Sequence, residues 1–159
     1  MANYAYNWVN FSGEETQIKK VNAMFKAMQE KQKDTNEAQL PPFMTAPKEG
    51  YFFEIQENET DCISYTTRWS PNVLDLIEIA NHFNLNFEVR YEESGNQIFG
   101  MAIFTAGNSE AEKYELEDSD YDLFSFDEET GMYTYEGEEW ESDSEILESI
   151  FEKKFNFSY

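Results

Sequence analysis

The sequence is poor in the residues that carry most nucleophilic, redox and metal chemistry. It holds one cysteine, Cys62, and one histidine, His82, in 159 residues. A single cysteine excludes an intramolecular disulfide framework and fits a reducing compartment. No run approaches the roughly 20 apolar residues that span a bilayer, and no N-terminal segment has the pattern of a secretory signal peptide. We therefore expect a cytoplasmic protein with no membrane contact.

Basic residues are also scarce. There are 11 lysines and arginines against 33 aspartates and glutamates, so the formal charge is −22. A phosphate backbone or an anionic lipid leaflet repels such a surface. The charge therefore disfavours direct binding to nucleic acid or to membranes, and it favours a basic protein surface as the partner.

The chain lacks a recognisable catalytic constellation. Cys62 lies in an expected strand and His82 lies near the end of an expected helix, where packing is the usual role of such side chains. The sequence contains no glycine-rich phosphate loop, no nucleophile elbow and no cluster of cysteines and histidines with metal-ligand spacing. We expect no enzyme activity, no catalytic residue and no cofactor, and an enzyme that uses Cys62 and His82 remains an alternative.

The acids are concentrated toward the C-terminus of a chain that is rich in core formers. Residues 1–50 hold six acids and six lysines, residues 51–107 nine acids and two arginines, and residues 108–159 hold 18 acids and three lysines. The chain is nevertheless 40% apolar and 17% aromatic, which excludes general disorder. We predict a folded core over residues 1–107 and an acidic, aromatic-rich extension over residues 108–159 that packs on the core.

Alternation and helical spacing predict the elements of this core. Residues 4–11 alternate apolar and polar side chains as a strand does, and Ser12 then fits a helix N-cap with Glu15 completing a capping box. The following helix should end near Asp34. Its apolar stripe is Ile18, Val21, Met24, Phe25 and Met28.

Four further strands and a second helix follow in the core. The strands are predicted over residues 51–56, 62–69, 86–91 and 97–105, the first pair being joined by a turn at 57–61. Ser70 as N-cap and Pro71 at the first helical position start the second helix. Its buried stripe is Val73, Leu76, Ile77 and Ala80. The order of elements predicts an α+β fold.

The extension also shows a regular pattern. Strands are expected over residues 113–117 and 131–135, and an amphipathic helix runs from Asp143 to about Lys154. The extension is therefore predicted to be an α/β appendage that ends in a helix.

Three segments of the core have a distinctive order and spacing. They are Asn3-Tyr-Ala-Tyr-Asn-Trp8 with Phe11-Ser-Gly13, Tyr65-Thr-Thr-Arg-Trp-Ser-Pro71, and Tyr91-Glu-Glu-Ser-Gly95 with Phe99-Gly-Met101. In these segments the chain resembles uncharacterised phage and plasmid proteins that carry a YubB-type ferredoxin-like domain. The resemblance covers about residues 1–107 and leaves out the acidic extension. It implies a ferredoxin-like antiparallel sheet with two helices on one face and a mobile-element origin, and it supplies no catalytic residues.

The extension supplies the predicted binding residues, in two groups. The acidic face is Asp118, Asp120, Asp122, Asp127, Glu128, Glu129, Glu136, Glu138, Glu139 and Glu141. The aromatic anchors are Tyr121, Phe124, Tyr133 and Trp140, within a wider aromatic group that includes Phe126 and Tyr135. Charge accelerates association with a basic partner, whereas buried aromatic anchors give residence time and specificity.

The same segment contains an alternative, a calcium site. Asp118, Asp120 and Asp122 have the spacing of an EF-hand loop, and Glu129 stands at its twelfth position. Leu123 occupies the sixth position, where the sharp turn requires glycine, and a chain with so many acids produces such matches by chance. We expect no metal here and keep a calcium-dependent binding module as an alternative.

Charge distribution and the resemblance together lead to a functional expectation. We expect an anti-defence protein of a mobile element, with an anti-CRISPR protein as the leading case, that inhibits a host nucleic-acid-binding effector. Its acidic surface would imitate the nucleic acid that the effector holds. Two other interpretations remain open: the acids serve only solubility, or the chain is a non-enzymatic interaction protein of phage or plasmid maintenance.

Overall fold

The computed structural model describes residues 2–58 and 61–159. It divides into two compact units, Met1–Lys113 and Tyr114–Tyr159, which we call the N-terminal unit and the acidic unit. The expectation that the extension packs on the core stays a prediction. Two residues of the turn predicted at 57–61, Glu59 and Thr60, lie outside the described residues. Across the described part of the chain, no helix combines the length and the apolar character needed to cross a bilayer.

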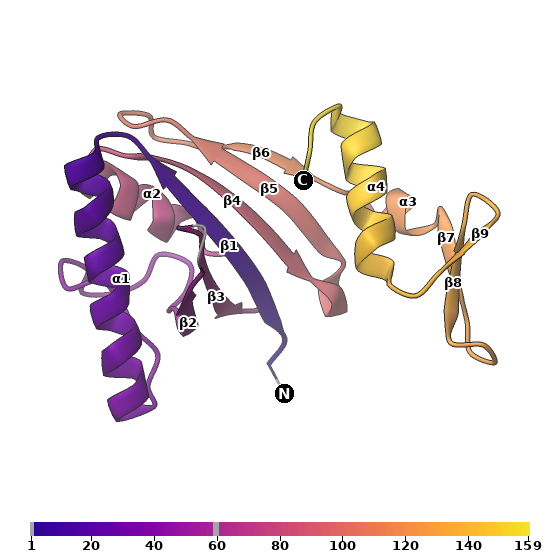
Figure 1. Ribbon diagram of the computed structural model, residues 1–159, viewed down its shortest axis with the longest axis horizontal. Helices are drawn as coiled ribbons and strands as arrows, with labels where there is room; N and C mark the ends of the chain where they lie inside the picture. Colours follow the sequence, from indigo (N-terminus) through magenta and orange to yellow (C-terminus); the bar gives the residue numbers. More distant parts are fainter. Residues whose placement is uncertain (1, 59–60) are drawn as a thin grey trace. The chain divides into compact units, whose positions relative to one another are not determined.

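The N-terminal unit is built on a mixed order of strands and helices (Figure 1). Its elements are β1 (Tyr4–Ser12), α1 (Glu15–Thr35), β2 (Phe53–Glu57), β3 (Ile63–Arg68), α2 (Val73–Phe83), β4 (Asn86–Glu93), the 3-10 turn η1 (Ser94–Asn96) and β5 (Ile98–Phe104); β6 (Glu112–Glu115) follows across the boundary between the units. The sheet order is β2-β3-β1-β4-β5-β6, and β1 pairs antiparallel with both β3 and β4. The order β2-β3-β1-β4, with a helix after β1 and after β3, is the ferredoxin-like arrangement. The predicted α+β class and ferredoxin-like sheet are confirmed.

The register shows which face of this sheet is buried. Val9 of β1 lies opposite Val89 of β4, and Val89 lies opposite Ala102 of β5, so these side chains share one face. The same hydrophobic core contains the predicted stripes of both helices, including Phe25 of α1 and Leu76 of α2. Both helices therefore pack on one face of the sheet, as predicted, and the two stripes follow from helical periodicity alone.

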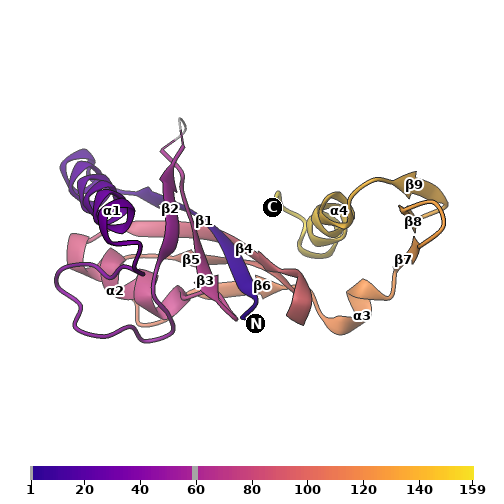
Figure 2. The same cartoon turned by 90° about the horizontal axis from the view of Figure 1, so that it is seen from below.

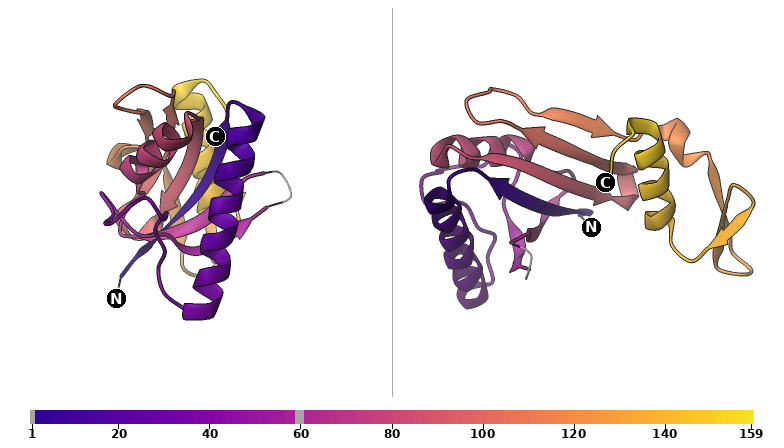
Figure 3. Two further views of the ribbon diagram at one scale, coloured as in Figure 1. Left: turned by 90° about the vertical axis from the view of Figure 1, so that its left-hand side faces the viewer. Right: turned by 45° about the horizontal axis from the view of Figure 1, so that its top comes forward.

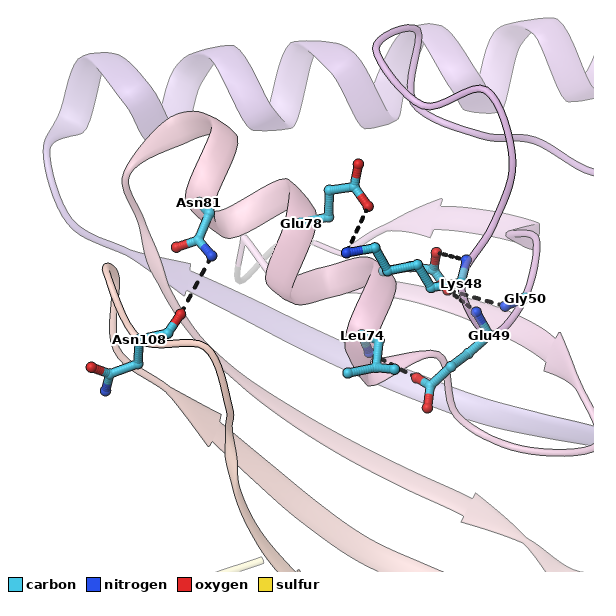
Figure 4. A network of polar contacts seen from close by, with 8 residues as sticks. Lys48, Glu49, Gly50, Leu74, Glu78, Asn81 and Asn108 are labelled. Carbon is cyan, nitrogen blue, oxygen red and sulfur yellow. Dashed lines mark hydrogen bonds and ion pairs between the residues drawn. The ribbon is translucent and has the colours of Figure 1, made fainter.

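A buried carboxylate holds the loop between α1 and β2 against the start of α2. Asp75 is 0% exposed, and its two carboxylate oxygens accept the backbone N–H groups of Lys48, Glu49 and Gly50 at 2.6, 2.9 and 3.0 Å. Figure 4 shows these three loop residues gathered beside α2, where Glu49 also accepts the N–H of Leu74 at 2.7 Å. Three consecutive backbone donors of this long loop are therefore satisfied by one side chain of α2.

Both predicted helix N-caps are wrong. Ser12 remains in β1, opposite Asn86, and α1 begins after Glu14. The second helix begins after Asn72 rather than Ser70, and Asn72 uses its side chain to accept from Tyr65 Oη at 2.9 Å and to donate to Gly50 at 3.1 Å. Strand pairing and a buried polar network therefore prevail over local capping preference at both positions.

The acidic unit combines a small sheet with a helix (Figures 2 and 3). Its elements are α3 (Asp118–Tyr121), β7 (Phe124–Asp127), β8 (Met132–Tyr135), β9 (Glu138–Trp140) and α4 (Asp143–Phe155), with β7-β8-β9 forming an antiparallel sheet. The predicted strand at 131–135 and the final helix are present. Strands β7 and β9 were not expected. Strand β9 follows a two-residue turn in which Glu136 and Gly137 have φ of 50° and 80°, the pattern of a type I′ hairpin.

An aromatic cluster secures the end of α4 within the acidic unit. Phe151, 0% exposed, contacts the rings of Phe155 and Tyr159 at centroid distances of 4.8 and 5.0 Å. Phe157 contacts Tyr114 at 4.8 Å. The unit therefore has an apolar centre of its own despite its charge.

Candidate protein-binding surface of the acidic unit

The predicted aromatic anchors come together on one face of the small sheet. Residues directly opposite each other in an antiparallel pair share a face. Phe124 lies opposite Tyr135, Phe126 lies opposite Tyr133, and Tyr133 in turn lies opposite Trp140. Ser125, Thr134 and Glu139 occupy the other face by the same register. We call the set Phe124, Phe126, Tyr133, Tyr135 and Trp140 the aromatic face.

The rings of this face contact one another and differ in exposure along it. Phe126 and Tyr133 have ring centroids 4.8 Å apart, and Phe124 is 6.1 Å from Tyr133. Tyr121 of α3 joins the cluster through Phe124 at 6.3 Å. Tyr135 is buried, whereas Phe126 is 53% exposed. The Phe126 end of the face is thus the part that a partner can reach.

Leu123 extends this exposed end and was missed by the sequence analysis. It is 55% exposed and immediately precedes β7. Its position in the acid-rich segment gave it no periodic signal, because it lies in the short connection between α3 and β7. Phe126, by contrast, alternates with Phe124 in the pattern Phe-Ser-Phe-Asp. That alternation would have placed it with the anchors from sequence alone.

The predicted acids lie mostly in the turns and edges around the aromatic face. Asp127 ends β7, and Glu128 and Glu129 follow in the β7–β8 turn, where the Asp127 side chain accepts the N–H of Glu129 at 2.9 Å. Glu136 lies in the β8–β9 turn, Glu138 and Glu139 in β9, and Glu141 follows β9; all are exposed. The hairpin turns therefore present carboxylates at both ends of the small sheet.

Asp120 is the exception among the predicted acidic residues. Its side chain is 12% exposed, lies 2.6 Å from the ammonium of Lys154, and accepts the backbone N–H of Glu117 at 2.7 Å. It completes a capping box at the start of α3. Asp120 is thus a structural residue within the acidic unit. The charge pattern of the sequence does not distinguish it from the exposed acids beside it.

The two lysines of the acidic unit are both engaged inside it. Lys153 Nζ lies 2.8 Å from Glu136 and 5.2 Å from the centre of the Tyr135 ring. Lys154 also contacts Glu117, at 3.4 Å. The hydrogen bond with Lys153 lowers the pKa of Glu136, and the hydrogen bond with Asp120 raises the pKa of Lys154. Lys154 therefore contacts a mostly buried carboxylate, whereas Lys153 and Glu136 form an exposed pair with side chains 56% and 61% exposed.

The charge density of the acidic unit can be compared with that of duplex DNA. The unit contains 16 acids and two lysines, a formal charge of −14. Duplex DNA carries one charge per about 1.7 Å, so 14 charges correspond to about 24 Å of duplex. A compact unit of this length has a radius of gyration of about 9 Å and hence a diameter of about 24 Å. The charge per length is therefore similar to that of a duplex.

The four acids of the calcium alternative are spread over different elements of the acidic unit. Asp118 and Asp120 belong to the helix α3, Asp122 follows it, and Glu129 lies in the β7–β8 turn. Within residues 2–58 and 61–159, no three histidine, cysteine, aspartate or glutamate side chains are arranged so that they could hold a metal ion. A helix at Asp118–Tyr121 also replaces the extended loop that the EF-hand spacing requires.

Cys62 and His82 lie in the N-terminal unit in packing roles. Cys62 is 6% exposed, and burial raises the pKa of its thiol, which reduces the thiolate fraction that a nucleophile needs. The His82 ring stacks on Phe43, with centroids 3.7 Å apart and planes 5° from parallel. Neither environment is typical of an activated catalytic residue.

Comparison with known proteins identifies the family of the chain. The family model described as the ferredoxin-like domain in Api92-like protein matches residues 50–136, more than half of the sequence. No curated protein and no solved structure matches the chain. The match begins at β2 and continues through β8, beyond residue 107, where the resemblance seen in the sequence stops. The chain belongs to the family of the ferredoxin-like domain in Api92-like proteins.

Proposed function

We propose that the chain is a non-enzymatic inhibitor that uses its acidic unit to bind the basic groove of a nucleic-acid-binding protein. The observation that carries the proposal is the charge of Tyr114–Tyr159: 16 acids against two lysines, both engaged in ion pairs inside the unit. A surface with the linear charge of a duplex competes with nucleic acid for the same groove.

The aromatic face supports binding beyond simple charge attraction. Phe126 and Leu123 are each more than half exposed beside a rim of carboxylates. Apolar anchors inside a charged rim are the pattern of protein interfaces that dissociate slowly. Acids that served only solubility would not require exposed aromatic and aliphatic side chains among them.

The finer proposal concerns the biological setting. The sequence resemblance to YubB-type phage and plasmid proteins favours a mobile element as the source. An element of this kind benefits from blocking host nucleases in the host cytoplasm, and those nucleases hold DNA or RNA in basic grooves. We therefore propose an anti-defence role, with RNA-guided CRISPR effectors as the first targets to test.

The experiment is a binding and competition assay with the full chain. Immobilised nucleic-acid-binding defence effectors, each with and without its RNA or DNA ligand, are titrated with the protein across a salt series. We expect binding that weakens steeply with salt and that is lost when the nucleic acid occupies the groove.

Two triple variants with equal charge change make the test specific. Glu138→Gln, Glu139→Gln and Glu141→Gln together should weaken binding and flatten the dependence of log Kd on log salt by about one unit per lost ionic contact. Glu30→Gln, Glu37→Gln and Glu57→Gln remove three exposed carboxylates from the N-terminal unit and should leave both quantities nearly unchanged. Binding that is insensitive to salt and to the first variant would overturn the proposal.

A different result would favour the interaction-protein alternative. If the chain binds an effector or another basic protein while that protein still holds its nucleic acid, then the acidic unit does not occupy the groove. The chain would in that case be an accessory that recruits or assembles proteins rather than an inhibitor.

A further inference from the structure

The face of the N-terminal sheet opposite the helices carries aromatic side chains on its central strand. Tyr4, Tyr6 and Trp8 alternate with the buried residues of β1, and Tyr4 and Tyr6 are 41% and 52% exposed. The rings of Tyr6 and Trp8 are nearly parallel, 24° apart, with centroids separated by 6.4 Å. Exposed aromatic side chains that adjoin one another on a sheet face mark a candidate binding surface.

A cavity lies beside these two rings. It has a volume of about 170 Å³, and it is lined by Tyr6, Asn7, Trp8, Glu54, Gln56, Ser64, Tyr65 and Thr66. We call it the open-face pocket. Its wall contains one carboxylate, that of Glu54, and the lining includes no lysine or arginine. The lining of the pocket thus combines aromatic rings with one carboxylate, and Arg90 of β4 lies opposite Trp8 beside it.

The backbone is distorted to place Glu54 in this wall. Phe53 lies opposite Thr66, whereas Gln56 lies opposite Ser64, so β2 holds one extra residue in a β-bulge between these pairs. Glu54 has φ of 48°, in the left-handed region that favours glycine. Its Oε2 accepts from Thr66 Oγ1 at 3.4 Å. Bulges that re-aim a side chain and strained non-glycine residues both cluster at functional sites.

The neighbouring part of the same face already holds a cation on a ring. The Arg68 guanidinium lies 5.0 Å from the centre of the Phe53 ring, and the Phe53 ring contacts that of Tyr4 at 6.0 Å. Arg68 lies directly opposite Tyr4 in the β1–β3 pair. A cation–π contact is therefore already present on this face.

We propose that the open-face pocket binds a lysine or arginine side chain of a basic protein partner. The cation would lie against the rings of Tyr6 and Trp8 and form an ion pair with Glu54. A cation within about 6 Å of a ring centre is attracted to it. A nucleic-acid base would also stack on the rings, but its phosphate would face Glu54 and the negative charge of the whole chain. The pocket lies in the N-terminal unit and does not depend on the function proposed for the acidic unit.

The test uses the full chain and a small probe pair. Acetyl-arginine methylamide is titrated while the indole N–H resonance of Trp8 is followed by NMR, and acetyl-citrulline methylamide, which has nearly the same shape without charge, is the ligand control. We expect a saturable shift of the Trp8 resonance and an affinity for the arginine compound about threefold or more above that for citrulline.

Three variants assign the response to the pocket. Glu54→Gln and Tyr6→Ser should each abolish the preference for arginine, whereas Tyr51→Ser, which removes another exposed tyrosine of the same unit, should retain it. Neutralising Glu138, Glu139 and Glu141 should leave the Trp8 response unchanged, which separates this site from the acidic unit.

Three outcomes overturn the proposal. They are equal responses to arginine and citrulline in the wild-type chain, a preference for arginine that survives Glu54→Gln, and a Trp8 response to a single-stranded oligonucleotide but not to arginine. The last outcome would assign the face to base stacking instead.

Discussion

Lys154 and Asp120 form the shortest ion pair of the acidic unit among those that the structure describes, with Nζ 2.6 Å from Oδ2. The same carboxylate oxygen accepts the backbone N–H of Glu117, so one oxygen joins the helix α4 to the first turn of α3. Asp120 therefore links two elements of a unit whose other acids are mostly exposed.

Replacing Asp120 should destabilise the acidic unit more than replacing the exposed Asp118. Asp120→Ala removes the partner of Lys154 and the acceptor of the Glu117 N–H, and we expect a loss of about 2 kcal/mol in the free energy of unfolding. Asp118→Ala, two residues earlier and exposed, should change stability by less than about 0.5 kcal/mol. Chemical denaturation followed by tryptophan fluorescence measures both. Equal effects of the two substitutions would contradict the structural role of Asp120.

The Glu136–Lys153 pair should make the acidic unit sensitive to acid. The hydrogen bond from Lys153 lowers the pKa of Glu136 below its ordinary value of 4.5. The stabilisation is therefore fully present above pH 4.5 and is lost as the pH falls through the lowered pKa. Amide hydrogen exchange of β8 and β9, measured from neutral to acidic pH, should show this loss.

The loss of stabilisation at acidic pH that is described above should disappear when Glu136 is replaced. Glu136→Gln removes the titrating group, so the variant should be less stable at neutral pH and should lack the loss on acidification. Glu139→Gln, on the other face of the same hairpin, should keep the wild-type pH profile. An unchanged profile in Glu136→Gln would argue against the pair as the source of the pH dependence.

Substitution at the exposed end of the aromatic face should change the lifetime of a complex. Phe126→Ser should increase the dissociation rate from a basic partner about tenfold, because an anchor residue contributes about 1–2 kcal/mol to binding. Leu74→Ser, in α2 and 43% exposed, provides the control and should leave the rate unchanged. Surface plasmon resonance at fixed salt measures both rates. A change confined to the association rate would indicate that Phe126 is not an anchor.

Relief of strain at Glu54 should stabilise the fold and remove the ligand response. Glu54→Gly allows φ of 48° without a side-chain clash and should raise the free energy of unfolding by about 1 kcal/mol. Glu54→Ala removes the carboxylate but retains the strain, so it should lose the arginine response without gaining stability. If both variants are destabilised alike, the bulge serves packing rather than the pocket.

A further substitution tests the anchoring of the long loop. Asp75→Ala leaves three backbone N–H groups without the buried carboxylate that accepts them, and we expect a loss of about 3 kcal/mol with faster hydrogen exchange at Lys48, Glu49 and Gly50. Glu78→Gln removes an ion pair whose lysine is 56% exposed and should cost less than about 0.5 kcal/mol. Denaturation and exchange on the full chain decide between a structural loop and a freely mobile one.

The sequence predicted the fold where one periodic signal dominates. The stripes of α1 and α2 and the alternation of β1 correspond to buried faces, because burial of apolar area outweighs local preferences. The caps at Ser12 and Ser70 were wrong because pairing with Asn86 and the network of Asn72 are tertiary effects. Strand β9 escaped notice because its glutamates have low strand propensity and the Glu136-Gly137 turn determines the pairing.

The residues of the candidate sites also fall into those that the sequence predicts and those that depend on the folded structure. The acidic face and the aromatic anchors followed from composition and alternation, and the register then placed Phe124, Tyr133 and Trp140 on a common face. The burial of Asp120 required knowledge of where Lys154 lies, which no local pattern gives. The open-face pocket depends on a bulge at Glu54, and a single extra residue in a strand has no signature in hydrophobic periodicity.

The central position of β1 has a consequence for how the chain folds during synthesis. β1 is made before its partners, which are residues 63–68 on one side and 86–92 on the other. Its ladder with β3 cannot close until Arg68 has left the ribosome, and its ladder with β4 cannot close until Glu92 has followed. Until β4 has emerged, an aromatic strand with at least one unpaired edge is exposed in the nascent chain. We expect the N-terminal unit to fold slowly and to benefit from chaperones that bind emerging hydrophobic segments.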